Sequence, residues 1–510
     1  MHYAFCLSAL ITALLLTGGC ASAPLDYPRE ASSAITHTSH TVQAGYVDEW
    51  LDGNTDVNGF YPLNEGFDAF GARLLLIDKA EVSIDLQYFL MKSDNAGYVL
   101  ADKLLEAAER GVRVRVLLDD IFTTVRDEQL AVLDAHPNLE VRIFNPIARK
   151  GIYAFNYLGN FSLTNRRMHN KALIADNQIA VVGGRNLAVE YYQLEETGEF
   201  MDFDMLSVGP IVRDVSGEFD SYWNHQLAVP LEALFALKDE ARLEEMRTAL
   251  QQLMAQAGDS IYAEAINTEV LNNLLDRSAS PYIADARLIV DQPQKLLEEI
   301  SNEQKIVANE VRDVLLNAET EVIISTPYFI PRERGIEILR ELGAKGVRVV
   351  LFTNSLSTNN HTAVHSAYSS YRQDILDAGV ELWEARADAV KITSQDGEIQ
   401  PGRLTLHTKG ILVDRNKIFV GSLNLDPRSI DINTEMGLLI NSPELSSRLS
   451  ANFLGRLPEV AYRVRQDPDG NLRWHALIDG KDVIETKEPQ TSGWERFKAW
   501  LMKIAPESQL

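Results

Sequence analysis

The sequence of 510 residues predicts an α/β protein built from two tandem repeats, each with a mixed, mostly parallel sheet flanked by helices. The first observation is internal similarity. AEVSIDLQYF (80–89) corresponds to TEVIISTPYF (320–329), and RGVRVRVLLDD (110–120) corresponds to KGVRVVLFTNS (345–355). The second observation is the order of patterns in each repeat: an apolar β-branched run, a helical pattern, and another apolar run. This order indicates a β-α-β unit, in which helices cover parallel strands.

The elements of this unit carry local signals. A strand is expected over 80–89, followed by a helix that includes YVLADKLLEAAERG (98–111). Gly111 fits the end of this helix because glycine readily adopts the left-handed conformation that often follows a helix C-terminus, and Gly346 holds the same place in the second repeat. Between the repeats, the charged segment 230–286, rich in Ala and Leu, predicts a helical connector.

The formal net charge of -25 limits the classes of partner. Binding a polyanion depends on Lys and Arg that displace counterions, so nucleic acid is not an expected partner. The same charge argues against a general attraction to anionic lipid. A role at a membrane would therefore need a local device.

The N-terminus contains one candidate device. The run AFCLSALITALLLTGGC (4–20) is apolar, short for a membrane span and ends in small residues, which is typical of a secretory signal, although no Lys or Arg precedes it. Residues 1–19 then resemble a lipoprotein-type signal peptide, with lipidation at Cys20. The alternative is a buried N-terminal helix with a free thiol. The segment 20–60 begins with small, polar and proline residues and predicts a flexible tether.

Lipidation would place the chain in the bacterial cell envelope, facing the periplasm, because several acyl chains give stable anchoring. Ala21 stands where an aspartate is associated with inner-membrane retention, which implies the outer membrane by resemblance to other lipoproteins. The only other cysteine, Cys6, lies in the signal, so the mature chain would contain no disulfide.

A motif with a histidine, a lysine and an aspartate occurs once in each repeat. The stretches MHNKALIADNQIAVVGGRN (168–186) and LHTKGILVDRNKIFVGSLN (406–424) share H-x-K-x-x-x-x-D followed by G-x-x-N at the same offsets. Two such matches inside a duplication are specific, whereas one alone would be weak. The motif residues are His169, Lys171, Asp176, Gly184 and Asn186, and His407, Lys409, Asp414, Ser422 and Asn424.

Each motif is expected to form a β-hairpin, with the histidine and lysine on one face because they are two residues apart. If the loop has an even number of residues, the opposed pairs are His169–Asn186, Lys171–Gly184, His407–Asn424 and Lys409–Ser422. An odd loop would break this register. The alternative interpretation is two polar hairpins that only hold the fold together.

Such a patch suits displacement at a phosphodiester. A neutral imidazole can attack phosphorus, a second and protonated imidazole can protonate the leaving alcohol, and Lys and Asn can donate hydrogen bonds to the phosphate oxygens. Glu435 and Asp204 follow the two asparagines at corresponding places and are candidates to orient the histidines. Asp176 and Asp414 belong to the motif, but an aspartate at a turn is more often structural. No cluster of thiols or histidines predicts a metal or other cofactor.

Over residues 63–465 the sequence resembles the phospholipase D superfamily, whose signature is this duplicated motif. The resemblance implies a two-lobed α/β fold with pseudo-twofold symmetry and one metal-independent site between the lobes. It implies that His169 is the nucleophile, that His407 is the general acid and base, and that the lysines and asparagines hold the phosphate. Domains are expected at 61–229 and 287–465. Four stretches resemble the bacterial cardiolipin synthase C branch: NRRMHNKALIADNQIAVVGGRN, DFDMLSVGPIV, GSLNLDPRSIDINTEMG and EPQTSGWERFKAWL.

The C-terminal extension, 466–510, contains a candidate amphipathic helix in SGWERFKAWLMKIAP. Its apolar face would contain Trp494, Phe497, Trp500, Leu501 and Ile504. Such a helix can lie in a membrane interface. The alternative is a terminal helix packed on the core.

The implied function is transfer of a phosphatidyl group from a phospholipid donor to phosphatidylglycerol, which gives cardiolipin. The alternative is a phospholipase D that hydrolyses or exchanges head groups, and a nuclease is disfavoured by the net charge. An inactive lipid-binding envelope protein would have lost motif residues, and both motifs are intact. The sequence leaves open the donor head group and any accessory protein.

Overall fold

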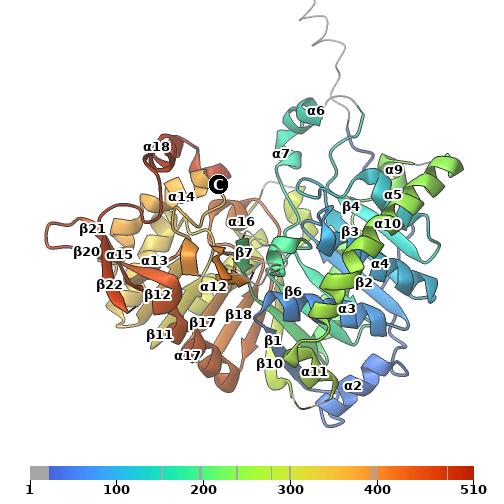
Figure 1. Cartoon of the computed structure of the whole chain (residues 1–510), viewed down its shortest axis with the longest axis horizontal. Helices are drawn as coiled ribbons and strands as arrows, with labels where there is room; N and C mark the ends of the chain where they lie inside the picture. Colours follow the sequence, from blue (N-terminus) through green and yellow to red (C-terminus); the bar gives the residue numbers. More distant parts are fainter. Residues whose placement is uncertain are drawn as a thin grey trace, which may run out of the picture.

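The computed structural model describes residues 22–150, 153–193, 198–236, 239–276, 278, 280–297, 300–389, 391–393, 399–478 and 480–510. The predicted signal peptide and Cys20 lie outside these residues. No helix in the described part of the chain is both long and apolar enough to cross a membrane. Two α/β halves lie side by side (Figure 1), and we call residues 22–236 the first half and residues 282–510 the second half.

Both halves repeat one strand order, which confirms the mixed α/β duplication. The order is β4, β3, β2, β5, β6, β8, β1 in the first half and β13, β12, β11, β17, β18, β19, β10 in the second. β1 pairs antiparallel with β10, so a sheet of 18 strands runs through the molecule. Within this sheet the parallel pairs are those of the three strands of each β-α-β region, and the flanking hairpins pair antiparallel, so the sheets are mixed rather than mostly parallel as expected.

The strands of the first half are β1 (Asn58–Leu63), β2 (Ser83–Tyr88), β3 (Arg113–Asp119), β4 (Leu139–Phe144), β5 (Ala172–Ala175), β6 (Ile179–Gly183), β7 (Gly198–Met201), β8 (Asp204–Val208) and β9 (Ala228–Pro230). Those of the second half are β10 (Tyr282–Val290), β11 (Glu321–Ser325), β12 (Arg348–Thr353), β13 (Glu381–Ala385), β14 (Lys391–Thr393), β15 (Ile399–Pro401), β16 (Arg403–Leu406), β17 (Gly410–Val413), β18 (Lys417–Gly421), β19 (Met436–Asn441), β20 (Ala461–Gln466), β21 (Leu472–Ile478) and β22 (Lys481–Glu485).

Helices cover both faces of the sheet. In the first half these are α3 (Gly66–Lys79), α4 (Asn95–Glu109) and α5 (Asp127–Asp134) on one face and α8 (Ile211–Trp223) on the other. In the second half they are α12 (Ile306–Leu316), α13 (Arg332–Ala344) and α15 (Arg372–Asp377) opposite α17 (Pro443–Val460). The shorter or peripheral helices are α2 (Val42–Trp50), α6 (Tyr153–Gly159), α7 (Phe161–Thr164), α14 (Thr362–Ser369), α16 (Pro427–Asp431) and α18 (Gly493–Met502).

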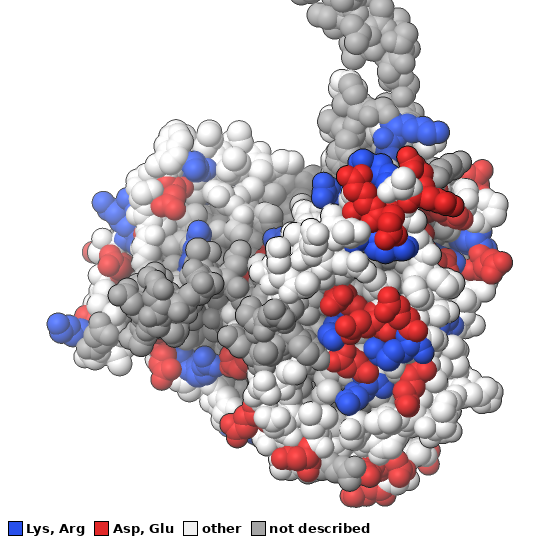
Figure 2. Space-filling model, turned by 45° about the vertical axis from the view of Figure 1, so that its right-hand side comes forward, with Lys and Arg blue, Asp and Glu red and all other residues white. Residues whose placement is uncertain are grey.

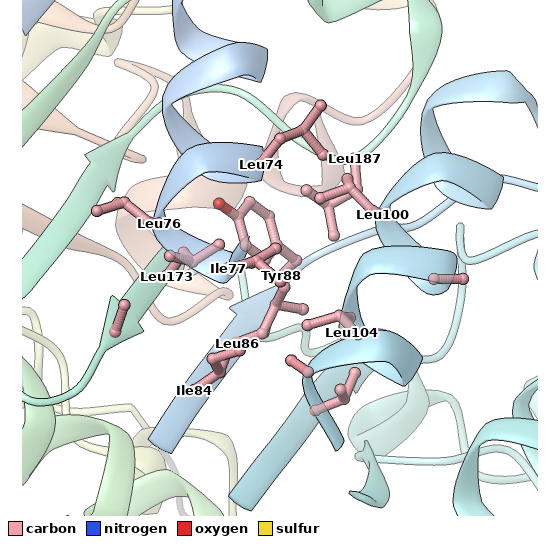
Figure 3. Close-up of a cluster of buried hydrophobic side chains, with 14 of the residues drawn as sticks. Leu74, Leu76, Ile77, Ile84, Leu86, Tyr88, Leu100, Leu104, Leu173 and Leu187 are labelled. Atoms are coloured by element: carbon pink, nitrogen blue, oxygen red, sulfur yellow. The ribbon is translucent and has the colours of Figure 1, made fainter. Parts of the chain in front are cut away.

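The core of the first half forms where β2 meets α3 and α4. Figure 3 shows Ile84, Leu86 and Tyr88 of β2 directed toward leucine and isoleucine side chains of these helices, and the β2 side chains are at most 2% exposed. The helix expected near 98–111 is α4, and Asp94 caps its N-terminus because the Asp94 carboxylate accepts the Gly97 N–H. The helix ends before Gly111. The backbone at this position has a φ of 94°, a conformation that favours glycine because glycine has no Cβ.

The connector differs from its prediction at its end. Residues 231–275 form α9 (Leu231–Leu234), α10 (Glu240–Ala265) and α11 (Glu269–Leu275), as a helical connector should. Residues 282–286 instead begin β10, which pairs with β1 at its start and with β19 further along. The segment therefore joins the two sheets through a strand, because β1 would otherwise leave an unpaired edge.

The prediction of a flexible tether over 20–60 is wrong for the residues that the structure describes. Residues 22–40 run along the first half, where Arg29 donates to the carbonyls of His225 and Ala228. Buried Arg142 and Arg115 donate to the carbonyls of Glu30 and Ser32. Buried guanidinium groups need acceptors, and this segment supplies them before the chain enters α2 and β1.

The two motif aspartates lie in the hairpin turns, away from the histidines. Asp176 accepts the N–H groups of Glu81, Val82 and Ser83, and Asp414 accepts those of residues 319–321. Each turn has three residues, of which the first two have φ values near 50°. The even-loop register is therefore wrong by one residue, and Lys171 and Lys409 face Gly183 and Gly421. These aspartates therefore hold the hairpin turns against the neighbouring strands, as an aspartate at a turn often does.

Replacing Asp176 with alanine should destabilise the protein. The change leaves the N–H groups of residues 81–83 without their buried acceptor, which should lower the free energy of unfolding by about 2–4 kcal/mol. Asp176→Asn keeps one acceptor oxygen and should cost less. Denaturant unfolding of both variants checks this. Full stability of Asp176→Ala would contradict the structural role.

Candidate active site

The two histidines lie at the interface of the halves, where short stretches of backbone cross between them. β7 of the first half pairs parallel with β16 of the second, and the His407 N–H donates to the Met201 carbonyl at 2.8 Å. On the other side Met168 bridges to Thr434, and the His169 N–H donates to the Thr434 carbonyl at 3.0 Å. Each histidine backbone is thus fixed by the opposite half.

His169 pairs with a carboxylate from the second half. Its Nδ1 lies 2.9 Å from an oxygen of Glu435, which is fully buried and also accepts the Ser422 hydroxyl. A neutral His169 then carries its proton on Nδ1, and its Nε2 keeps the lone pair. The Phe89 ring packs edge-on against the imidazole at 4.8 Å and helps to fix its plane. Glu435, the acid expected to orient the histidine of its own half, thus contacts the histidine of the opposite half.

His407 pairs with Asp202 rather than with Asp204. Its Nδ1 lies 2.6 Å from the Asp202 carboxylate. Asp204 is instead buried against Arg73, at 2.8 Å, and Arg185, at 3.3 Å. The choice of Asp204 as the orienting acid is therefore wrong, because its charge already neutralises two buried arginines.

The strand register shows how Asp202 could have been found. Asp204 faces Gly183 across β6 and β8, and the corresponding residue of the second half, Gly437, faces Gly421. Glu435 lies two residues before Gly437, as Asp202 lies two residues before Asp204. Pairing DFDMLSV with EMGLLI by strand register finds Asp202, whereas counting from the asparagines does not.

The Gly184 and Ser422 positions differ for the same reason. A Cβ on Gly184 would lie 2.2 Å from an Asp202 oxygen, so no side chain fits there. The space that Ser422 fills next to Glu435 is taken by the Asp202 carboxylate in the other half of the site. The two motifs therefore differ at this position because the acid beside Gly184 is an aspartate, whereas the acid beside Ser422 is a glutamate.

The two lysines are buried within the same cluster. Each donates to the carbonyl of its own histidine at 2.6 Å, Lys171 to His169 and Lys409 to His407. Burial, together with repulsion from Lys409, lowers the pKa of Lys171 to about 7. Burial lowers the pKa of Lys409 to about 8, although Asp202 and Glu435 oppose the shift.

Burial and the lysines also set the charge of the histidines. Burial, reinforced by Lys171 and Lys409, holds the pKa of His169 well below its usual range. Burial and Lys409 lower the pKa of His407 to about 3, against the attraction of Asp202. Burial raises the pKa of Glu435 to about 7, although Lys171 opposes the shift. Both imidazoles are therefore neutral at pH 7, and the buried lysines make the cluster favourable for a negatively charged group.

The two asparagines leave polar atoms without protein partners. Among the described residues, Oδ1 of Asn186 and Oδ1 of Asn424 are buried and have no hydrogen-bond partner. The Asn186 amide contacts the Tyr191 hydroxyl at 2.9 Å, and the Tyr191 ring lies 5.0 Å from His407. Because a tyrosine hydroxyl can donate or accept, the amide can turn and offer its N–H₂ group to a ligand.

A cavity of about 610 Å³ adjoins Asp202 between the halves. Aromatic and aliphatic side chains, among them Phe200, Leu412 and Phe453, line it together with polar groups such as Asn452. A mixed lining of this kind suits an amphiphilic molecule. No group of three or more His, Cys, Asp or Glu within the described ranges is placed to hold a metal ion.

Comparisons with known proteins agree with this geometry. A family model described as cardiolipin synthase, PLD-like domain, matches residues 74–223 and 311–457, which contain both motifs. Cardiolipin synthase C of Escherichia coli (strain K12) is 34% identical over 454 residues, covering 88% of this chain and 95% of that protein. The major cardiolipin synthase of Bacillus subtilis (strain 168) is 26% identical over 402 residues, 78% of this chain and 69% of that protein.

One solved structure has a similar overall fold. The phosphatidylserine synthase of Haemophilus influenzae Rd KW20 superposes with a TM-score of 0.54 at 14% identity, covering 90% of this chain and 96% of that chain. At this identity the likeness concerns the fold alone.

Replacing Asp202 and Asp204 with asparagine, one at a time, should show that the two aspartates have different roles. Asp202→Asn should release the Nδ1 proton of His407 from its acceptor, so that the imidazole loses its fixed tautomer while the fold persists. Asp204→Asn should instead lower the free energy of unfolding by about 3–5 kcal/mol, because Arg73 and Arg185 lose their buried counter-charge. Nitrogen NMR of labelled histidine reports the tautomer, and denaturant unfolding reports stability. A tautomer change at His407 in Asp204→Asn, together with a loss of stability in Asp202→Asn, would contradict the geometry.

Proposed function

The chain belongs to the family of cardiolipin synthases with a phospholipase D-like domain, and we propose that its two histidines carry out transfer of a phosphatidyl group between lipids. It is a phospholipase D-type phosphatidyltransferase of cardiolipin synthesis. The observation that supports the proposed mechanism best is the pair of buried imidazole–carboxylate contacts, His169–Glu435 and His407–Asp202, at one interface.

In the first step, Nε2 of His169 attacks the phosphorus of a donor phospholipid. The N–P bond forms and the bond from phosphorus to the head-group oxygen breaks. His407, in its protonated form, gives its proton to that oxygen, and Asp202 stabilises the imidazolium. The product of this step is a phosphatidyl group on His169.

In the second step, the neutral His407 accepts the proton of a hydroxyl group of phosphatidylglycerol. That oxygen attacks phosphorus, the N–P bond breaks, and His169 leaves as a neutral imidazole held by Glu435. Cardiolipin is the product. Each proton taken from one alcohol has been delivered to the other, so the enzyme returns to its starting state.

The charges of the site fit an anionic substrate. A phosphodiester beside Lys171 and Lys409 supplies the negative charge that the buried cluster needs. Its charge also raises the pKa of His407 from about 3, which allows this residue to act as an acid. The amides of Asn186 and Asn424 supply further donors as charge develops on the phosphate oxygens.

We propose that the chain works in the bacterial envelope, lipid-anchored at Cys20 and facing the periplasm. The sequence of the first 20 residues supports this location, and Ala21 supports the outer membrane. Phospholipids are the substrates, and no cofactor takes part in the proposed steps. A metal-independent mechanism is consistent with the donors present, because the two lysines can supply positive charge and the two amides can supply hydrogen bonds to the phosphate oxygens.

Lipid extraction from a cardiolipin-free bacterial host that expresses the protein tests the proposed reaction. Mass spectrometry should detect cardiolipin with the wild type and with His40→Ala, an exposed histidine outside the site. His169→Ala and His407→Ala should reduce it by at least about a thousandfold, since each removes an essential step. Accumulation of phosphatidic acid without cardiolipin would support hydrolysis instead. Cardiolipin formation by either alanine variant would contradict the two-histidine mechanism.

A further inference from the structure

Helix α18 leaves an aromatic face uncovered. Trp494 and Trp500 are 62% and 65% exposed, and both stack on Phe497, with ring centroids 5.5 and 5.9 Å apart. The opposite side of the helix is fixed to the fold, because Ala499 is buried and its carbonyl accepts the Ser366 hydroxyl of α14 at 2.6 Å. The helix is therefore docked on the core, as one of the two alternatives drawn from the sequence has it, and its aromatic side is exposed.

A second exposed apolar group lies on the first half, in helices α6 and α7. Leu158 is 64% exposed, and Phe155 and Phe161 are also exposed. Tyr157 packs edge-on against Phe161 at 5.6 Å. Figure 1 shows α6 and α7 projecting from the same upper edge of the molecule as α18, on the other side of the interface between the halves.

The two groups are linked by hydrogen bonds across the interface of the halves, close to His169. Asn165, directly after α7, donates to Gln509, in the segment after α18, at 2.8 Å. Arg428 donates to the Asn165 carbonyl at 2.7 Å, and its N–H donates to the Leu510 carbonyl. The pKa of His169, lowered chiefly by burial, is lowered further by the charge of Arg428. The ends of both helical groups thus meet beside the nucleophile.

We propose that α18 and the α6–α7 pair form a two-sided platform that inserts into the interface of a phospholipid bilayer and holds this edge of the molecule, near His169, on the head groups. This inference rests on the proposed function, because the platform serves substrates that reside in a bilayer. An acyl anchor would tether the chain without orienting it, whereas apolar contacts on both sides of the interface between the halves fix the orientation of the protein on the bilayer.

The chemistry of the platform matches a lipid surface better than a protein partner. Tryptophan beside basic residues is typical of interfacial helices. Arg496 and Lys498 lie between the aromatic residues of α18, and Lys503 directly follows the helix. Lys498 lies over the Trp494 ring at 5.6 Å. Elsewhere the charge is mixed, since Figure 2 shows acidic side chains gathered with basic ones over the outer helices of the first half. The platform thus provides a local membrane-binding surface on a chain whose net negative charge opposes a general attraction to anionic lipid.

Quenching by brominated phosphatidylglycerol in vesicles tests the platform directly. The full chain carries Cys20→Ala, so that no acylated cysteine contributes. Leu158→Trp should gain a component of fluorescence that the vesicles quench, and Trp494→Phe/Trp500→Phe should lose most of the quenching seen in the parent. Ile283→Trp is the matched control, because Ile283 is 52% exposed on β10, away from the platform. Equal quenching of the reporters at 158 and 283, or none at 158, would overturn the proposal.

A kinetic experiment separates failure of the platform from failure of the proposed function. Leu158→Glu and Trp500→Glu should each lower cardiolipin formation on phosphatidylglycerol vesicles at least about tenfold. With short-chain phosphatidylglycerol as dissolved monomers, the same variants should retain the wild-type rate within about twofold. Equal losses on both substrates would overturn the platform. A wild type inactive on both substrates would instead overturn the proposed function, and the quenching result would still decide whether the platform binds lipid.

Discussion

The pairing of each histidine with a carboxylate of the opposite half is the interaction on which the rest of the structure depends. His169 needs Glu435 and His407 needs Asp202, and all four side chains are nearly inaccessible to water. Burying a carboxylate without its partner lowers the stability of the fold by several kcal/mol, so the acid of each half depends on the histidine of the other half. The crossing backbone segments and the shared sheet edge keep the two pairs in place. The duplication is thus a requirement of the site.

The same cluster explains why the site is specific for an anion. Two lysines and two imidazoles share a buried volume with Asp202 and Glu435, and burial lowers the pKa of every basic group among them. In the proposed mechanism, a phosphodiester would supply negative charge beside the lysines and accept hydrogen bonds from the amides. The net charge of the whole chain does not oppose this, since the attraction acts over a few ångströms inside the protein.

The sequence allowed the parts of the fold that depend on local pattern to be predicted. The repeated motif located both histidines and lysines, and the β-α-β pattern located α4 and the parallel strands. The hairpin register was mispredicted, because the loop contains one residue more than an even turn and its aspartate and the next residue adopt positive φ. Asp202 was missed because the chain between Asn186 and β8 is longer than its counterpart, so an offset in residues does not transfer. The packing of residues 22–40 depends on the acceptors needed by Arg115 and Arg142, which no local pattern reveals.

The most direct measurement is the identity of the residue that carries the phosphatidyl group during turnover. The protein would be mixed with donor phospholipid in the absence of acceptor, quenched within milliseconds and digested for mass spectrometry. The account predicts an adduct on the peptide that contains His169, strongly reduced by Glu435→Gln, which removes the charge that orients this imidazole. An adduct on His407, or donor cleavage with the phosphatidyl group on neither histidine, would contradict it.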